Sequence, residues 1–92
     1  MVPHKRQDPF KNMWYVYIIQ STSNQGYYAG VTKDLQERLS RHNSGRSRYT
    51  KNRGPWIYRH TEPFKDLPSA RKREFFIKKQ KSKRFIESLI AG

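Results

Sequence analysis

The chain has 92 residues, with 20 Lys and Arg against 7 Asp and Glu, and it has no Cys. This length allows one domain with a thin core, and the lack of Cys excludes disulfide scaffolds and thiolate metal sites. A formal charge of +13 favours a polyanionic partner, either nucleic acid or an anionic membrane face. Aromatic residues make up 14% of the chain, which is more than a solvated, disordered tail carries.

The first twelve residues are polar, contain Pro3 and Pro9, and show no apolar periodicity. They predict a flexible tail over residues 1–12, followed by one domain over residues 13–92. No apolar run approaches the roughly 20 residues that a membrane span requires, and the N-terminal segment lacks the apolar stretch of a secretory signal. We therefore expect a cytoplasmic protein without a membrane partner.

Aromatic and β-branched residues fill positions 14–20, and a polar turn at 21–26 joins them to a second such segment at 27–32. This pattern predicts a β-hairpin. The next segment, DLQERLSRHNSG, predicts a helix that is capped by Asp34 or Thr32 and ends at Asn-Ser-Gly.

A basic loop at residues 45–54 precedes a third strand, which we expect at residues 56–61. Pro55 and Pro63 flank this strand, and Pro is confined to edge strands and strand ends because it cannot donate to a ladder. The third strand is therefore expected at an edge of the sheet.

The last third of the chain predicts two helices. The first runs from Asp66 or Leu67 to about Gln80, with Pro68 tolerated in its first turn. The second is short and begins at Ser82. The element order is ββαβαα, which indicates an α/β (α+β) fold with a three-stranded, mostly antiparallel sheet and helices packed on it.

Positive charge is concentrated in residues 41–59, which hold six basic residues and no acidic one. Its cations alternate with Tyr49 and Trp56, an arrangement that suits phosphates and exposed bases. The alternative is that Trp56 belongs to the core and the cations only aid solubility. The residues predicted to bind nucleic acid are Arg41, Arg46, Arg48, Tyr49, Lys51 and Arg53.

Candidate chemical groups lie in three places. The hairpin carries two tyrosine triplets, at residues 15–17 and 28–30. Arg38 and His42 are four residues apart, on one face of the predicted helix. Glu74 is a lone acid in a strongly basic helix. Taken singly, the tyrosines fit a core, the helix pair fits a solvated face, and the glutamate fits an i, i+4 ion pair.

Taken together and in order, these segments resemble the GIY-YIG nuclease superfamily. The resemblance runs from about Trp14 to Ile90 and rests on YVYII, GYYAG, DLQERLSRHNSG, RGPW, SARKREFFIKKQK and KRFIESLI. It is nearest to the small stand-alone, single-domain branch, which is related to the nuclease module of the excinuclease family. The resemblance implies a metal-dependent endonuclease that hydrolyses DNA phosphodiesters and is directed by structure, such as branched, nicked or damaged DNA.

The resemblance also implies roles for five residues. Glu74 would be the sole protein ligand of one Mg²⁺ or Mn²⁺ ion. Tyr17, with Tyr28, would orient and deprotonate the attacking water, and Arg38 would favour the phenolate and bind the phosphate. His42 would take or relay a proton. Whether a tyrosine or the histidine is the base stays open.

Gly30 would allow backbone and phosphate to approach closely. The sequence departs from the family pattern at Tyr15 and Ala29, which replace the first Gly and the second Ile of the family name. Many members carry a polar residue, usually Asn, about a dozen residues after the glutamate, where this chain has residues 85–88, FIES. Two alternatives follow: a DNA- or RNA-binding module that keeps the fold without turnover, and a basic protein associated with RNA or the ribosome.

Overall fold

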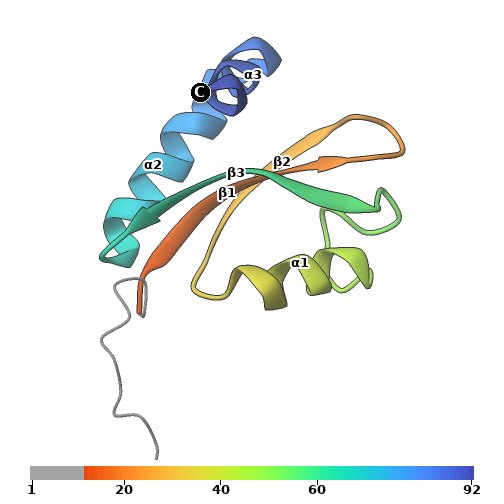
Figure 1. The fold of residues 1–92 in the computed structure, drawn as a ribbon, viewed down its shortest axis with the longest axis horizontal. Coiled ribbons are helices and arrows are strands. Elements are labelled where there is room, and N and C mark those ends of the chain that lie inside the picture. Colours follow the sequence, from red (N-terminus) through yellow and green to blue (C-terminus); the bar gives the residue numbers. More distant parts are fainter. Residues whose placement is uncertain (1–11) are drawn as a thin grey trace, which may run out of the picture.

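The computed structural model describes residues 12–92, so the tail predicted for residues 1–12 lies outside the described part except for Asn12. The elements follow the predicted order ββαβαα (Figure 1). They are β1 (Trp14–Ser21), β2 (Tyr27–Thr32), α1 (Leu35–Asn43), β3 (Trp56–Phe64), α2 (Leu67–Gln80) and α3 (Lys83–Ala91).

The three strands form one sheet in the order β2-β1-β3, and both pairings are antiparallel. β3 is an edge strand, as predicted, but it extends past Thr61 to Phe64. Pro63 lies inside the strand opposite Tyr15 of β1. An edge strand tolerates this proline because it has ladder positions that need no N–H donor.

The helices cover both faces of the sheet, with α1 on one face and α2 and α3 on the other (Figure 1). The central strand β1 serves both faces, because successive side chains of a strand point to opposite sides. Val16 and Ile18 pack toward α2 and α3, whereas Tyr17 and Ile19 pack toward α1. All four side chains are fully buried.

Each helix begins at a side-chain cap. Asp34, Asp66 and Ser82 accept a hydrogen bond from a backbone N–H in the first turn of α1, α2 and α3, respectively. Such caps satisfy N–H groups that have no partner within the helix. Within residues 12–92, none of these helices is long and apolar enough to cross a membrane.

The end of α1 is tied to the start of β3 by two hydrogen bonds. The Asn43 amide donates to the Trp56 carbonyl at 3.1 Å, and the Trp56 N–H donates to Asn43 Oδ1 at 2.7 Å. The Trp56 ring is buried with Tyr17 and Ile19, and its indole N–H donates to the carbonyl of Thr50 at 3.2 Å. The interpretation of Trp56 as a core residue is therefore confirmed, and the ring anchors the basic loop.

Candidate active site

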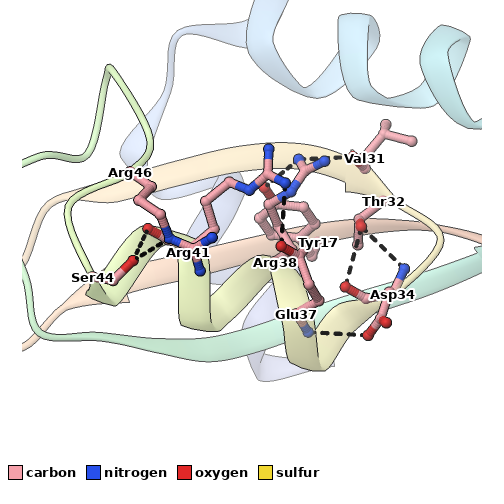
Figure 2. Close-up of polar contacts among 9 residues, drawn as sticks. All are labelled: Tyr17, Val31, Thr32, Asp34, Glu37, Arg38, Arg41, Ser44 and Arg46. Carbon is pink, nitrogen blue, oxygen red and sulfur yellow. Dashed lines mark hydrogen bonds and ion pairs between the residues drawn. The ribbon is translucent and has the colours of Figure 1, made fainter.

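The hydroxyl of Tyr17 is held between two side chains of α1. His42 Nε2 lies 2.7 Å from the Tyr17 oxygen, and Arg38 Nη1 donates to the same oxygen at 3.4 Å. Figure 2 shows Arg38 reaching from α1 to Tyr17 on β1 and to Val31 on β2. The four-residue spacing of Arg38 and His42 therefore directs both at one buried tyrosine.

Arg38 is fixed in place but keeps hydrogen-bonding capacity. Its Nη1 also donates to the Val31 carbonyl at 3.2 Å. Its Nε is buried and has no hydrogen-bond partner among residues 12–92. Because a guanidinium has five N–H donors, Arg38 can bind an anionic oxygen while it keeps its contacts to the sheet.

Thr50 completes a buried chain of hydrogen bonds behind the histidine. His42 Nδ1 lies 2.7 Å from Thr50 Oγ1, and the two residues are only 2% and 1% exposed. The Trp56 indole holds the Thr50 backbone. The sequence did not predict this role of Thr50, because a single hydroxyl in an irregular loop belongs to no periodic pattern.

Burial decides which of these groups carries a proton. It raises the pKa of Tyr17 to about 12, although the hydrogen bond and positive charge of Arg38 act in the opposite direction. Arg38 therefore favours the Tyr17 phenolate as expected, but burial outweighs its effect on the pKa. Burial lowers the pKa of His42 to about 4, and the charges of Arg38 and Arg41 add to this effect. At neutral pH, Tyr17 is a phenol and His42 is a neutral imidazole.

Glu74 is connected to this cluster through Lys78 and Tyr28. Its Oε2 lies 2.9 Å from Lys78 Nζ, and this nitrogen lies 5.2 Å from the ring centroid of Tyr28. The Tyr28 ring lies in turn 5.3 Å from the His42 ring. The negative charge of Glu74 also raises the pKa of Tyr17 slightly. The structure therefore brings together all five residues for which a catalytic role was predicted.

The donor set suits only a strongly hydrated metal ion. Glu74 offers one partly exposed carboxylate, and residues 12–92 contain no cluster of three or more His, Cys, Asp or Glu that could hold a metal. Zinc sites need three or four protein ligands. Mg²⁺ keeps several waters and binds through one or two carboxylates, so the residues present fit this ion.

Gly30 makes room for the Tyr17 ring. The two residues are paired across β1 and β2, and a Cβ on Gly30 would lie 2.6 Å from Tyr17 Cζ. Only glycine therefore permits this ring position. The closer approach of a phosphate at Gly30 stays a prediction.

The predicted nucleic-acid-binding residues all face solvent. Arg41 pairs with Glu37 at 3.2 Å, and Arg46 donates to the Ser44 hydroxyl at 2.8 Å (Figure 2). The Arg48 guanidinium lies 5.8 Å from the Tyr49 ring centroid. The residues concerned are Arg41, Arg46, Arg48, Tyr49, Lys51 and Arg53. They form a basic surface that includes an exposed ring, Tyr49, but not Trp56.

Comparisons with known proteins establish the family of this chain. The family model described as the GIY-YIG catalytic domain matches residues 13–87. A UPF0213 protein of Halobacterium salinarum is 43% identical over 67 residues, which cover 72% of this chain and 86% of the relative. A UPF0213 protein of Desulfotalea psychrophila is 34% identical over 76 residues, covering 80% and 68% of the two chains.

A solved structure is also similar. The solution NMR structure of a UPF0213 protein from Bacillus halodurans has 32% sequence identity and a TM-score of 0.53, and the match covers 86% of this chain and 83% of that one. The matched segment, residues 13–87, spans the five candidate site residues. This membership supports a nuclease-like function. The chain thus belongs to the GIY-YIG family, and its relatives are the small UPF0213 proteins.

Proposed function

We propose that this protein is a divalent-metal-dependent endonuclease that hydrolyses phosphodiester bonds in DNA. One observation carries the proposal: the buried Tyr17 hydroxyl lies 2.7 Å from His42 Nε2 and 3.4 Å from Arg38 Nη1, within the part matched by the catalytic-domain model. The cluster joins a phenol, an imidazole and a guanidinium, groups that can transfer a proton or bind a phosphate oxygen.

Proton transfer runs from the attacking water through Tyr17 to His42. A phenol with a pKa of about 12 keeps its proton at neutral pH, so it accepts the proton of water only as it releases its own. His42 Nε2 is unprotonated and within hydrogen-bond distance to receive it. In the tautomer that this path requires, Nε2 is free and Nδ1–H donates to Thr50 Oγ1, which lies 2.7 Å away.

Positive groups then stabilise the charge that develops on the phosphate. Arg38 donates to a non-bridging oxygen with the N–H groups that the sheet does not use. Glu74 would hold the hydrated divalent ion, which supplies Lewis acidity at the leaving oxygen. The exposed cations of the basic loop contact the DNA backbone.

We expect weak sequence preference and selection by DNA structure. Contacts from Lys and Arg to phosphates fix the position of a protein but carry little sequence information. Branched, nicked or damaged DNA is therefore the proposed substrate class. Cleavage profiling that found one defined recognition sequence would contradict this part of the proposal.

Plasmid nicking tests the proposed activity. Wild-type protein with Mg²⁺ or Mn²⁺ should convert supercoiled plasmid or branched DNA to nicked product, and EDTA should stop the reaction. Glu74→Ala should lose the activity, whereas Glu87→Ala, which removes an exposed acid on α3, should keep it. The nuclease proposal fails if wild type and Glu74→Ala behave alike, or if neither cuts any of these substrates.

A second candidate function is a nucleic-acid-binding module without turnover. The segment at residues 85–88 favours it, because Phe85 and Ile86 pack against the core and Glu87 and Ser88 follow where the usual Asn is expected. This module would bind DNA equally well after Glu74→Ala. Four phosphate contacts would give a log–log salt slope of about −3.6. Competition between RNA and DNA of equal length would identify an RNA-associated protein.

A further inference from the structure

A cleft of about 530 Å³ adjoins the candidate active site. Four aromatic residues line it, Tyr27, Tyr28, Tyr49 and Trp56, together with three cationic side chains and no carboxylate. A cleft of this volume is in the size range of small-ligand sites. It is large enough for one nucleotide but not for a stacked duplex.

We propose that this cleft binds one unpaired nucleotide of the DNA strand, with its base stacked on Tyr49. The inference rests on the proposed nuclease function and names the feature of the DNA that the site selects. Every base presents flat faces to an aromatic ring, and cations beside the rings neutralise the phosphates that flank the base. The cleft supplies both kinds of group, and its lining contains no carboxylate that would repel the phosphates.

Tyr49 is the exposed ring of the cleft. It is 65% exposed, although it is next to the fully buried Thr50. Trp56 already anchors the loop, so the core does not require the Tyr49 ring. Arg48 lies 5.8 Å from the Tyr49 ring centroid, which places a positive charge beside the stacking surface.

Two lining residues connect the cleft to the candidate active site. Tyr28 lines the cleft and contacts the His42 ring, and Lys78 lines the cleft and pairs with Glu74. A nucleotide in the cleft therefore has its neighbouring phosphate beside Glu74 and Tyr17. Cleavage then occurs next to the unpaired nucleotide.

This arrangement favours flaps and single-stranded segments over fully paired DNA. A base within a duplex must leave its stack and its partner before it can enter a cleft, whereas an unpaired base has less to lose. The unpaired nucleotide is thus the feature that directs the enzyme to branched or damaged DNA.

Binding without cleavage tests the inference. The full chain is titrated in EDTA with a fluorescein-labelled duplex that carries a short single-stranded flap, and with a fully paired duplex of equal length. Tyr49→Ala should weaken binding to the flap by about tenfold and leave binding to the paired duplex unchanged. Tyr49→Phe, which keeps the ring, should behave like wild type.

Phe75→Ala is the matched control, because Phe75 on α2 is 66% exposed, has cations one helical turn away on each side, and does not line the cleft. It should leave the preference for the flap unchanged. A 2-aminopurine at the first unpaired position should be quenched by wild type and by Tyr49→Phe but not by Tyr49→Ala. Circular dichroism should confirm that each variant is folded.

The inference is overturned if Tyr49→Ala weakens binding to both DNAs equally, if it leaves flap binding unchanged, or if Phe75→Ala causes the same selective loss. These outcomes are separate from the nuclease test. A protein with Tyr49-dependent flap binding that nicks no DNA would refute the nuclease function alone. A protein that cuts paired and flapped DNA equally, with no effect of Tyr49, would refute the cleft alone.

Discussion

The two faces of the sheet share one central strand but bury different kinds of side chain. Toward α2 and α3, Val16 and Ile18 pack against apolar residues such as Ile77. Toward α1, Tyr17 is buried with His42 and forms a hydrogen bond to it. Because side chains alternate along a strand, neighbouring residues of β1 belong to an apolar core on one face and to a hydrogen-bonded polar cluster on the other.

The buried hydroxyl and imidazole groups of the polar face satisfy one another, although Arg38 Nε on the same face has no hydrogen-bond partner among residues 12–92. A buried hydroxyl or imidazole without a partner is costly, and the chain from Tyr17 through His42 to Thr50 avoids this cost. The face toward α2 and α3 depends mainly on volume and shape, and its partly buried Glu62 is matched by Arg73 and His60. Substitutions one residue apart in β1 should therefore have different consequences for the cleavage rate and for the free energy of unfolding.

Tyr17→Phe should have the largest effect on activity. Removal of the hydroxyl eliminates the proposed proton path, so the single-turnover rate of DNA cleavage should fall by about 10³-fold. The fold should survive, with a loss of about 1–3 kcal/mol in the free energy of unfolding, because His42 and Arg38 lose a partner. Quench-flow cleavage and urea denaturation measure the two quantities. A variant that cuts at the wild-type rate would remove Tyr17 from the mechanism.

Ile18→Ala, one residue along β1, should show the opposite pattern. It creates a cavity on the apolar face and should reduce the free energy of unfolding by about 2–5 kcal/mol. If this unfolds the domain, the milder Ile18→Val should cost about 0.5–1.5 kcal/mol. The cleavage rate per folded molecule should be unchanged in either case. A folded but inactive Ile18→Val protein would show that the two faces are not separable.

The polar face should also make stability depend on pH. The folded pKa of His42, about 4, lies below its ordinary value near 6.5, so the unfolded chain binds a proton first as the pH falls. His42 should therefore contribute stability above pH 6.5 that is lost down to about pH 4, on the order of 3 kcal/mol. As the pH falls from 6.5 to 4, the urea midpoint of unfolding should decrease for wild type and decrease less for His42→Gln. Parallel curves would show that His42 titrates normally in the folded state.

Thr50→Val should have the smallest effect, and it tests orientation rather than proton transfer itself. Valine keeps the shape of the side chain but cannot accept from His42 Nδ1, so kcat should fall by about tenfold with KM unchanged. Thr50→Ser keeps the hydroxyl and should restore kcat. If serine is as poor as valine, Thr50 acts through packing alone.

The sequence predicted the elements because each depends on local patterns, whereas the five candidate site residues came from the resemblance to a known family and their roles stay predictions. The aromatic and β-branched residues at 14–20 and the capping residues Asp34 and Asp66 all act within a few positions. The observed elements match the predicted ones because the strand-forming and helix-capping preferences of these segments agree with the fold.

Features that depend on distant contacts were not predictable in the same way. Thr50 acquires its partner because Trp56 anchors the loop beneath α1, across a separation that no periodicity encodes. The protonation of Tyr17 depends on how deeply it is buried, and the sequence shows only the cations nearby. β3 continues past Thr61 because it pairs with β1, which overrides the local effect of Pro63.

Tyr49 and Thr50 are adjacent in the chain but face opposite environments. The Tyr49 ring is exposed to solvent, whereas the Thr50 hydroxyl is buried in contact with His42. A single peptide unit therefore joins an exposed ring to the hydroxyl that contacts the imidazole. Asn43 and Trp56 fix the ends of this loop through two hydrogen bonds. A displacement of the backbone at Tyr49 would therefore reach Thr50, and with it the His42 ring, across one residue.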